Sequence, residues 1–354
     1  MASTKGYRGY HGRTKGKKRL LIALLCLILL GAVGFLIAQR YIVYEADGGI
    51  HFALPWNKEK KPETTPSPDG KSSDEDLEII VEPPSQTGQD QLHVRELETA
   101  VLRGSMDTVL ASMEDSAFNA VAIQVKNSRG EIVYNSQIKE AIDAGAVAGG
   151  SIARAALEEM FSSEYYTIAR IATLHDSIYS FAHMADAAVI QLQHPGYIWY
   201  DPDSTFYLAA EKELARQYIV EIAKECASMG FDELLFDEFT YPPTGRLSNI
   251  DTTARTMSQS EALVLLAQEI REGVKGDEAL RLSVSLDAQT VLAGENEKTG
   301  QIVSELAEQF DRIYVETEPS EIPALQQALE PYSAEFVPIV SQALTEGNYL
   351  VKAS

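Results

Sequence analysis

Apolar residues recur along this chain with two different spacings, and the alternation between them predicts the fold class. Short apolar runs typical of buried strands occur at 95–101, 120–126, 166–173, 232–237, 281–286, 312–316, 334–340 and 347–352. Helical patterns separate most of them, at 105–114, 150–161, 204–229, 257–274, 300–309 and 321–329. This order predicts an α/β fold, a (β/α)8 TIM-type barrel. Because few residues follow Val340, a barrel that is incomplete at its C-terminus is the alternative.

One unit of this pattern ends in adjacent carboxylates. Its helix shows an apolar residue at every fourth position, formed by Leu214, Tyr218, Ile222 and Cys226. Gly230 then predicts the helix end, and a short apolar strand leads to Asp237 and Glu238. Ligands of α/β barrels bind beyond the carboxyl ends of the strands, so Asp237 is the first candidate for a functional residue.

Other carboxylates follow later strands. Asp287 comes after the fifth strand, and Glu316 and Glu318 come after the sixth. Side chains alternate along a strand, so Glu316 and Glu318 should share a face, whereas only one of Asp237 and Glu238 can face the barrel axis. Asp237 with Glu316 or Glu318 could then form an acid and base pair. The structural alternative is that such carboxylates cap helices or pair with Arg or Lys.

The segment from Gly230 to Pro242 resembles the hallmark of a family of glycoside-hydrolase-like TIM barrels catalogued as a domain of unknown function. That hallmark reads roughly Gly-Phe-Asp-Glu-Ile-x-Phe-Asp-Tyr-x-Arg-Phe-Pro. Further similarity lies in order at Asn119–Lys126, Gly130, Ile168–Ile171 and Trp199–Pro202. The resemblance covers residues 92 to 340 approximately. It implies a glycoside hydrolase without a cofactor, a polysaccharide or oligosaccharide partner, and Asp237 as a site residue.

Two long excursions follow strands and are expected on the active face: a hairpin from Lys126 to Tyr134 and a loop from Leu174 to Asp203. Asp176 corresponds to the Asp of a Lys-Asp pair in the family, which implies a binding role. The other substrate-binding candidates are Lys126, Trp199, Asp201 and Asp287. Trp199 could stack on a sugar ring or could pack the loop onto the barrel.

Three departures from the family pattern change the charge expected in the cleft. Gln124 stands where relatives commonly have an acidic residue, and Thr240 stands where they have Arg. After the sixth strand, residues 316–320 read Glu-Thr-Glu-Pro-Ser instead of Met-Val-Tyr-Pro-Ser. These changes fit either a shifted specificity or a barrel that has lost catalysis and binds glycan or organises the envelope.

The N-terminal part of the chain predicts a membrane anchor. Residues 20–38 carry no charge and are long enough to cross a bilayer, and a basic cluster precedes them, so residues 1–19 should be cytoplasmic and the remainder extracytoplasmic. A cleaved signal peptide is the alternative. Residues 39–56 read as a juxtamembrane segment or short hairpin, 57–91 as a disordered linker, and 92–354 as the barrel.

Charge and cysteine usage exclude several classes of function. The first 40 residues contain no acidic residue, so the rest of the chain is even more acidic than the whole, whose formal charge is −22. This acidity argues against a nucleic-acid partner. The two cysteines, Cys26 and Cys226, are placed too differently to pair. The six histidines show no metal-binding spacing, so no metal is expected, although acidic loops could hold Ca²⁺ without a readable motif.

Overall fold

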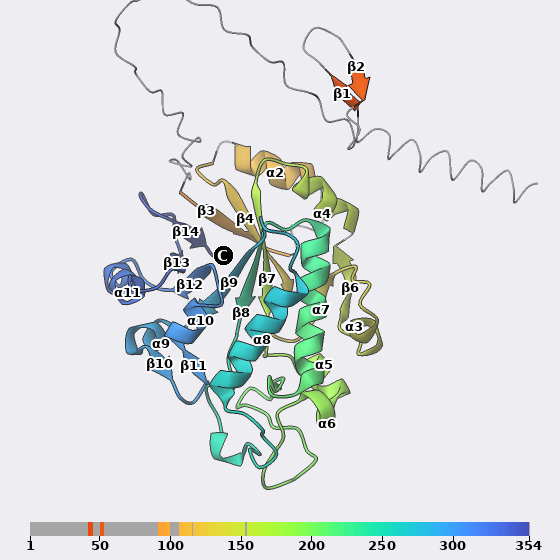
Figure 1. Ribbon diagram of the computed structural model, residues 1–354, viewed down its shortest axis with the longest axis vertical. Helices are drawn as coiled ribbons and strands as arrows, with labels where there is room; N and C mark the ends of the chain where they lie inside the picture. The colour runs from red at the N-terminus through yellow and green to blue at the C-terminus, as the bar shows by residue number, and fades with distance from the viewer. Residues whose placement is uncertain are drawn as a thin grey trace, which may run out of the picture. The chain divides into compact units, whose positions relative to one another are not determined.

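Eight parallel strands close into a barrel in the computed structural model, which describes residues 42–44, 50–52, 91–99, 106–114, 116–152 and 154–353. Around the barrel the order is β3-β14-β13-β12-β9-β8-β7-β4, and β3 pairs with β4 to complete the ring (Figure 1). The strands are β3 (His93–Leu97), β4 (Ala120–Lys126), β7 (Tyr166–Ala172), β8 (Glu233–Asp237), β9 (Arg281–Leu286), β12 (Arg312–Glu316), β13 (Glu335–Val340) and β14 (Tyr349–Val351). The (β/α)8 architecture is therefore confirmed, and the incomplete alternative is wrong because β14 pairs with both β13 and β3.

Helices cover the outside of the barrel. The longest, α7 and α8, pack side by side in front of the sheet in Figure 1. The helices are α2 (Met106–Glu114), α3 (Lys139–Asp143), α4 (Arg154–Phe161), α5 (Ser177–Ala182), α6 (Met184–Ala187), α7 (Glu213–Met229), α8 (Gln259–Gly273), α9 (Ala288–Ala293), α10 (Val303–Ala307) and α11 (Ile322–Leu329), with a 3-10 turn at Leu247–Asn249. Gly230 ends α7 in the left-handed conformation, as predicted, with φ of 107°.

The two faces of each strand feed two separate apolar cores. One set of side chains fills the barrel interior, among them Val94, Ala122, Ile168, Leu235 and Tyr314. The alternate side chains point outward and join the larger core between the barrel and its helices. Alternation along each strand therefore explains why these strands are apolar on both faces, as expected of a parallel sheet covered by helices.

Several elements differ from the prediction in length or type. The predicted helix 204–229 begins only at Glu213, because residues 204–212 belong to a hydrogen-bonded loop. The predicted strand 95–101 is shifted to His93–Leu97, and the predicted helix 150–161 begins at Arg154. Residues Val147–Ile152 instead form β6, which extends the sheet beyond β5 (Ile132–Tyr134). A further small hairpin, β10 (Glu295–Asn296) with β11 (Gln301–Ile302), was not predicted.

The chain separates into two compact units, Met1–Val81 and Glu82–Ser354. Within the first, β1 (Ile42–Tyr44) and β2 (Ile50–Phe52) form an antiparallel hairpin, one of the two alternatives for the juxtamembrane segment. The predicted membrane span at 20–38 and the predicted linker at 57–91, except its last residue, lie outside the described residues. Among the helices that the structure describes, none has the length and apolar character needed to cross a membrane.

Candidate active site

Asp237 lies at the last position of β8, at the rim where the barrel strands end, which we call the C-terminal rim. Arg170, from the neighbouring strand β7, donates to both oxygens of Asp237: Nε to Oδ2 at 2.8 Å and Nη2 to Oδ1 at 3.1 Å. Its third nitrogen, Nη1, bonds Glu96 of β3. All three side chains are nearly buried. One guanidinium thus holds two carboxylates together in the mouth of the barrel.

Burial and the guanidinium act in opposite directions on Asp237. Removal of the carboxyl group from water raises its pKa, while the charge and hydrogen bonds of Arg170 lower it, and the negative charges of Glu238 and Glu96 raise it further. The net result is a pKa of Asp237 above its ordinary value of 3.8. A buried carboxyl group with a raised pKa is typical of proton donors in active sites.

The loop after β7 covers this rim together with the loop after β8, and the two pair at Gln191 and Ile250. In Figure 1 they lie together at the lower end of the barrel. Trp199 is 1% exposed and packs in a small apolar core of these loops, and its Nε1 donates to the carbonyl oxygen of Arg246 at 3.1 Å. The indole therefore packs the loop, the second of the two roles considered for Trp199.

Asp201 ties the same loop together through its own backbone. Its Oδ1 accepts from the backbone N–H of Asp203 and Thr205, and its Oδ2 accepts from the Thr205 hydroxyl at 2.7 Å. Thr205 in turn contacts His175, which contacts Glu238. This chain of contacts places Asp201 on the same rim as Asp237.

Lys126 and Asp176 form an ion pair with no solvent exposure, at 2.9 Å. Lys126 also donates to the carbonyl oxygen of Ala172, and Asp176 accepts from the backbone N–H of Tyr179 as the N-cap of α5. A side chain at Gly130 would overlap the Asp176 carboxylate, since a Cβ there would lie 2.1 Å from its Oδ1. In this arrangement the pair fixes the hairpin after β4 against the loop after β7.

The remaining carboxylate candidates are exposed. Asp287 caps α9, accepting from the backbone N–H of Gln289 and Thr290. Glu316 ends β12 and pairs with Lys352 at 2.8 Å. Glu318 lies beyond the strand, in the turn leading to α11, so the alternation that would align it with Glu316 does not reach it. Across the described residues, no group of three or more His, Cys, Asp or Glu side chains gathers where a metal ion could bind.

Three residues of the rim were not selected from the sequence. Arg170 alternates with Ile168 along a mostly apolar strand, which is a readable signal for a charge inside the barrel. Glu96 stands in the same relation to Val94. Glu238 was set aside because alternation allowed only one of the two carboxylates to face the barrel axis and the resemblance selected Asp237. The strand ends at Asp237 and Glu238 adopts φ of 51°, so alternation does not apply to it.

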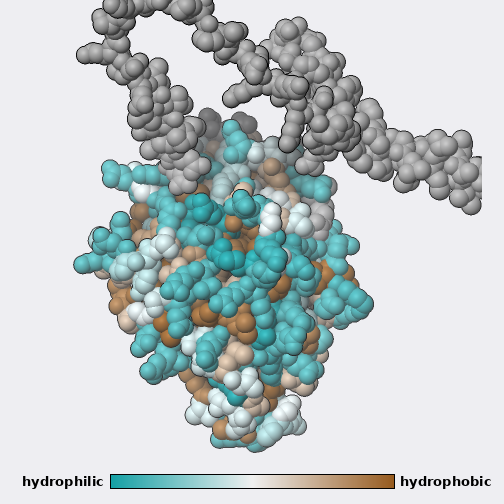
Figure 2. Space-filling model, viewed as in Figure 1, coloured by the Kyte–Doolittle hydropathy of each residue, from teal (hydrophilic) through white to brown (hydrophobic). Residues whose placement is uncertain are grey.

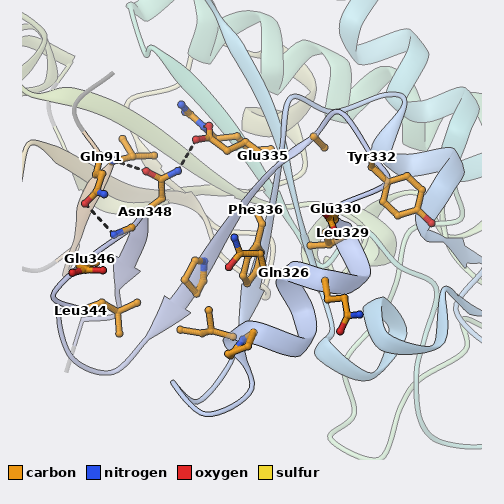
Figure 3. A pocket seen from close by; sticks show the side chains of 18 of the residues that line it. Gln91, Gln326, Leu329, Glu330, Tyr332, Glu335, Phe336, Leu344, Glu346 and Asn348 are labelled. Carbon is orange, nitrogen blue, oxygen red and sulfur yellow. Dashed lines mark hydrogen bonds and ion pairs between the residues drawn. The ribbon is translucent and has the colours of Figure 1, made fainter. Parts of the chain in front are cut away.

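A large pocket lies at the opposite rim, where the barrel strands begin, which we call the N-terminal rim. It has a volume of about 1120 Å³ and lies between α11 and the loop from β13 to β14 (Figure 3). At one end Asn348 bonds the backbone N–H of Leu92 and the carboxylate of Glu335, and Gln91 bonds the backbone N–H of Gly347. The pocket exists because the connection from β13 to β14 contains no helix that would cover Phe336 and Pro338.

The chain belongs to a known family. Residues 93–354 match the family described as "Putative glycosyl hydrolase domain", which confirms the resemblance read from the sequence. No curated protein matches the chain.

Several solved structures are similar to this chain, and one of them reaches a TM-score of 0.50. The glycoside hydrolase domain of PgaB (BpsB) from Bordetella bronchiseptica is similar with a TM-score of 0.50 and 13% identity, covering 75% of this chain and 93% of that domain. A hypothetical protein from Ruminiclostridium thermocellum is similar with a TM-score of 0.48 and 20% identity, covering 53% and 95%. A GH20 exo-β-N-acetylglucosaminidase from Vibrio harveyi, solved with N-acetylglucosamine, has a TM-score of 0.48 and 10% identity, covering 72% of this chain and 42% of its own.

Proposed function

We propose that this protein hydrolyses glycosidic bonds of a cell-wall or other surface polysaccharide at the C-terminal rim, with Asp237 as the proton donor to the leaving oxygen. The observation that carries the proposal is the position of Asp237: it ends a barrel strand beside a second carboxylate, and burial raises its pKa. Cleavage of a glycosidic bond needs a carboxyl group that is still protonated at the working pH.

The proposal includes the place of the enzyme in the cell. Residues 20–38 would anchor it, residues 57–91 would tether it, and the domain 92–354 would act outside the membrane on polysaccharide within reach. The basic cluster before the apolar segment and the acidic remainder of the chain support this orientation. Protease added to intact cells should then release the domain by cutting within residues 57–90, and a protected domain would contradict the topology.

The test of the activity is a polysaccharide screen. The purified full chain is incubated with cell-wall and plant polysaccharides, and released reducing ends are measured for the wild type and for Asp237→Asn. We expect release by the wild type only. Reducing ends formed equally by both proteins would remove Asp237 from the reaction.

One observation favours a second candidate, a barrel that binds glycan without cleaving it. Both oxygens of Asp237 are already engaged by Arg170, and a carboxylate in that state is a poor proton donor. Binding of polysaccharide by the wild type and Asp237→Asn with equal affinity, without released reducing ends, would support this candidate.

A further inference from the structure

Four side chains form a continuous line of hydrogen bonds beside Asp237. The Asp201 carboxylate contacts the Thr205 hydroxyl at 2.7 Å, and that hydroxyl contacts Nε2 of His175 at 2.6 Å. Nδ1 of the same ring lies 3.1 Å from Oε1 of Glu238. Tyr207 stacks on the imidazole with ring centroids 4.4 Å apart and planes within 2°. The ring is therefore fixed in orientation, and both of its nitrogens have defined partners.

The number of available protons decides how this line is arranged. Asp201 accepts three hydrogen bonds and therefore acts as an ionised acceptor. The single Thr205 proton is used in donating to it, so His175 must donate its Nε2 proton to Thr205 Oγ1. Nδ1 then faces a second carboxylate, and an unprotonated nitrogen there would be repelled. A further proton between Nδ1 of His175 and Oε1 of Glu238 resolves this conflict, and it joins the ring and the carboxylate by a hydrogen bond.

Glu238 is held in an unusual conformation with one oxygen left over. Its φ of 51° lies in the left-handed region that side chains other than glycine rarely adopt. Its second oxygen, Oε2, is buried and has no hydrogen-bond partner within the described part of the chain. A buried acceptor without a donor is unfavourable, so a donor that reaches Oε2 would be bound there. A water molecule or a sugar hydroxyl has the required chemistry.

We propose that Glu238 is the general base of the reaction, and that His175, Thr205 and Asp201 position it and keep it ionised. This inference rests on the function proposed above and adds the second carboxyl group that hydrolysis requires. Glu238 would be a catalytic residue because it touches the attacking water. The other three would be positioning residues.

The reaction is a single displacement. Water attacks the anomeric carbon while the glycosidic C–O bond breaks. The electron pair of that bond stays on the leaving oxygen, which takes the proton of Asp237, and the proton of the water passes to Oε2 of Glu238. Glu238 then releases a proton to solvent and Asp237 takes one up, so one water molecule is consumed and the anomeric configuration inverts.

The first test reads the protons of His175 directly. The full chain contains six histidines, so ¹⁵N-histidine labelling gives few imidazole signals, and His175→Gln assigns the relevant one. We expect protons on both nitrogens in the wild type, loss of the Nδ1 proton in Glu238→Gln, and a changed tautomer in Asp201→Asn. The matched control Asp203→Asn should leave the signal unchanged. A wild-type ring without a proton on Nε2 would overturn the arrangement.

The second test separates acid from base. Glu238→Gln should lose at least 100-fold in turnover on both polysaccharides and nitrophenyl glycosides, and azide should restore activity because it attacks without a base. Asp237→Asn should instead keep activity on nitrophenyl glycosides, whose leaving group needs no proton. If the wild type is active and Glu238→Gln is equally active, or if azide does not restore the activity of Glu238→Gln, then Glu238 is not the general base. Either result leaves the proposed function itself standing. A wild type that cleaves no substrate refutes the proposed function and the base together.

Discussion

The two rims of the barrel each hold an arginine between two carboxylates, yet the two clusters differ in how many hydrogen bonds their carboxylate oxygens receive. At the N-terminal rim, Arg312 bonds Glu233 and Glu335, and Glu233 also accepts from Ser283 and Tyr166. At the C-terminal rim, Arg170 bonds Asp237 and Glu96. The same ion-pair chemistry is thus built twice, in different surroundings.

The difference lies in the supporting donors. Glu233 has no solvent exposure, and both of its oxygens receive bonds from separate side chains. Among the described residues, Arg170 is the one side chain that donates to Asp237. The next residue, Glu238, has an oxygen, Oε2, with no hydrogen-bond partner in the described part of the chain. A cluster whose buried oxygens all have hydrogen-bond partners is typical of one that stabilises the fold. A buried carboxyl group with few partners and a raised pKa is typical of a reactive site. The large pocket at the N-terminal rim does not alter this, because the carboxyl group with the raised pKa lies at the other rim.

The largest effect that separates the rims is expected for Asp237→Asn. Turnover should fall by about 10⁴-fold, equivalent to about 5.4 kcal/mol of transition-state stabilisation. The free energy of unfolding should not fall, because the ionised form of Asp237 is already disfavoured by burial and the amide can still accept from Arg170. Steady-state kinetics and urea denaturation of the same preparation measure both. A large loss of stability would mean that Asp237, like Glu233, stabilises the fold.

Replacing the arginine of the N-terminal rim should destabilise the fold more than replacing the arginine of the C-terminal rim. Arg312→Met leaves Glu233 buried without its cation and should lower the free energy of unfolding by about 3–5 kcal/mol. Arg170→Met should lower it less, because Asp237 can take up a proton and because both of its carboxylates retain some exposure. Urea denaturation of the two variants compares them directly, and equal losses would contradict the difference between the rims.

A smaller effect is expected for Asp232→Asn at the N-terminal rim. Asp232 accepts from the backbone N–H and the hydroxyl of Thr167, and so joins the starts of β7 and β8. Loss of the charge should lower the free energy of unfolding by about 1 kcal/mol, while activity per folded molecule is retained. Thermal denaturation and kinetics of this variant check the expectation, and a selective loss of turnover would place function at this rim as well.

The smallest effect is expected from pH, because Arg170 offsets part of the burial of Asp237. The folded pKa is raised, so the folded state binds the proton more tightly than the unfolded state does. The contribution of Asp237 to stability is therefore present at acid pH and is lost as pH rises from about 4. Compared with Asp237→Asn, the wild type should lose stability over this range. A difference that moves in the other direction would mean that Arg170 lowers the pKa overall.

Much of the fold could be predicted because periodicity alone carries it. The strands β4, β9 and β12 begin and end at the predicted residues, since most of their positions on both faces are buried and apolar residues recur along each. β6 was missed because its sequence contains two adjacent glycines, and its conformation depends on pairing with β5. Pairing between distant segments leaves no periodic pattern in the sequence.

The site was less predictable than the fold. The position of Asp237 followed from the end of an apolar strand, but its ion pair with Arg170 joins residues on different strands. Glu238 was set aside on the assumption that the strand continued through it, and a positive φ at a glutamate cannot be read from residue type. Asp287, selected for the same reason as Asp237, is the N-cap of α9. Strand ends locate carboxylates, but only their partners show what they do.

Closure of the barrel through β14 and β3 has a consequence for the order of folding. The bond between the Leu92 N–H and Asn348 joins residues 256 positions apart. Such distant contacts form slowly, and during synthesis this one has to wait until β14 has emerged. Until then β3 and β13 each present an unpaired edge that can associate with another chain. We therefore expect variants at Asn348 to refold more slowly and to aggregate during refolding, even where the native protein is only slightly destabilised.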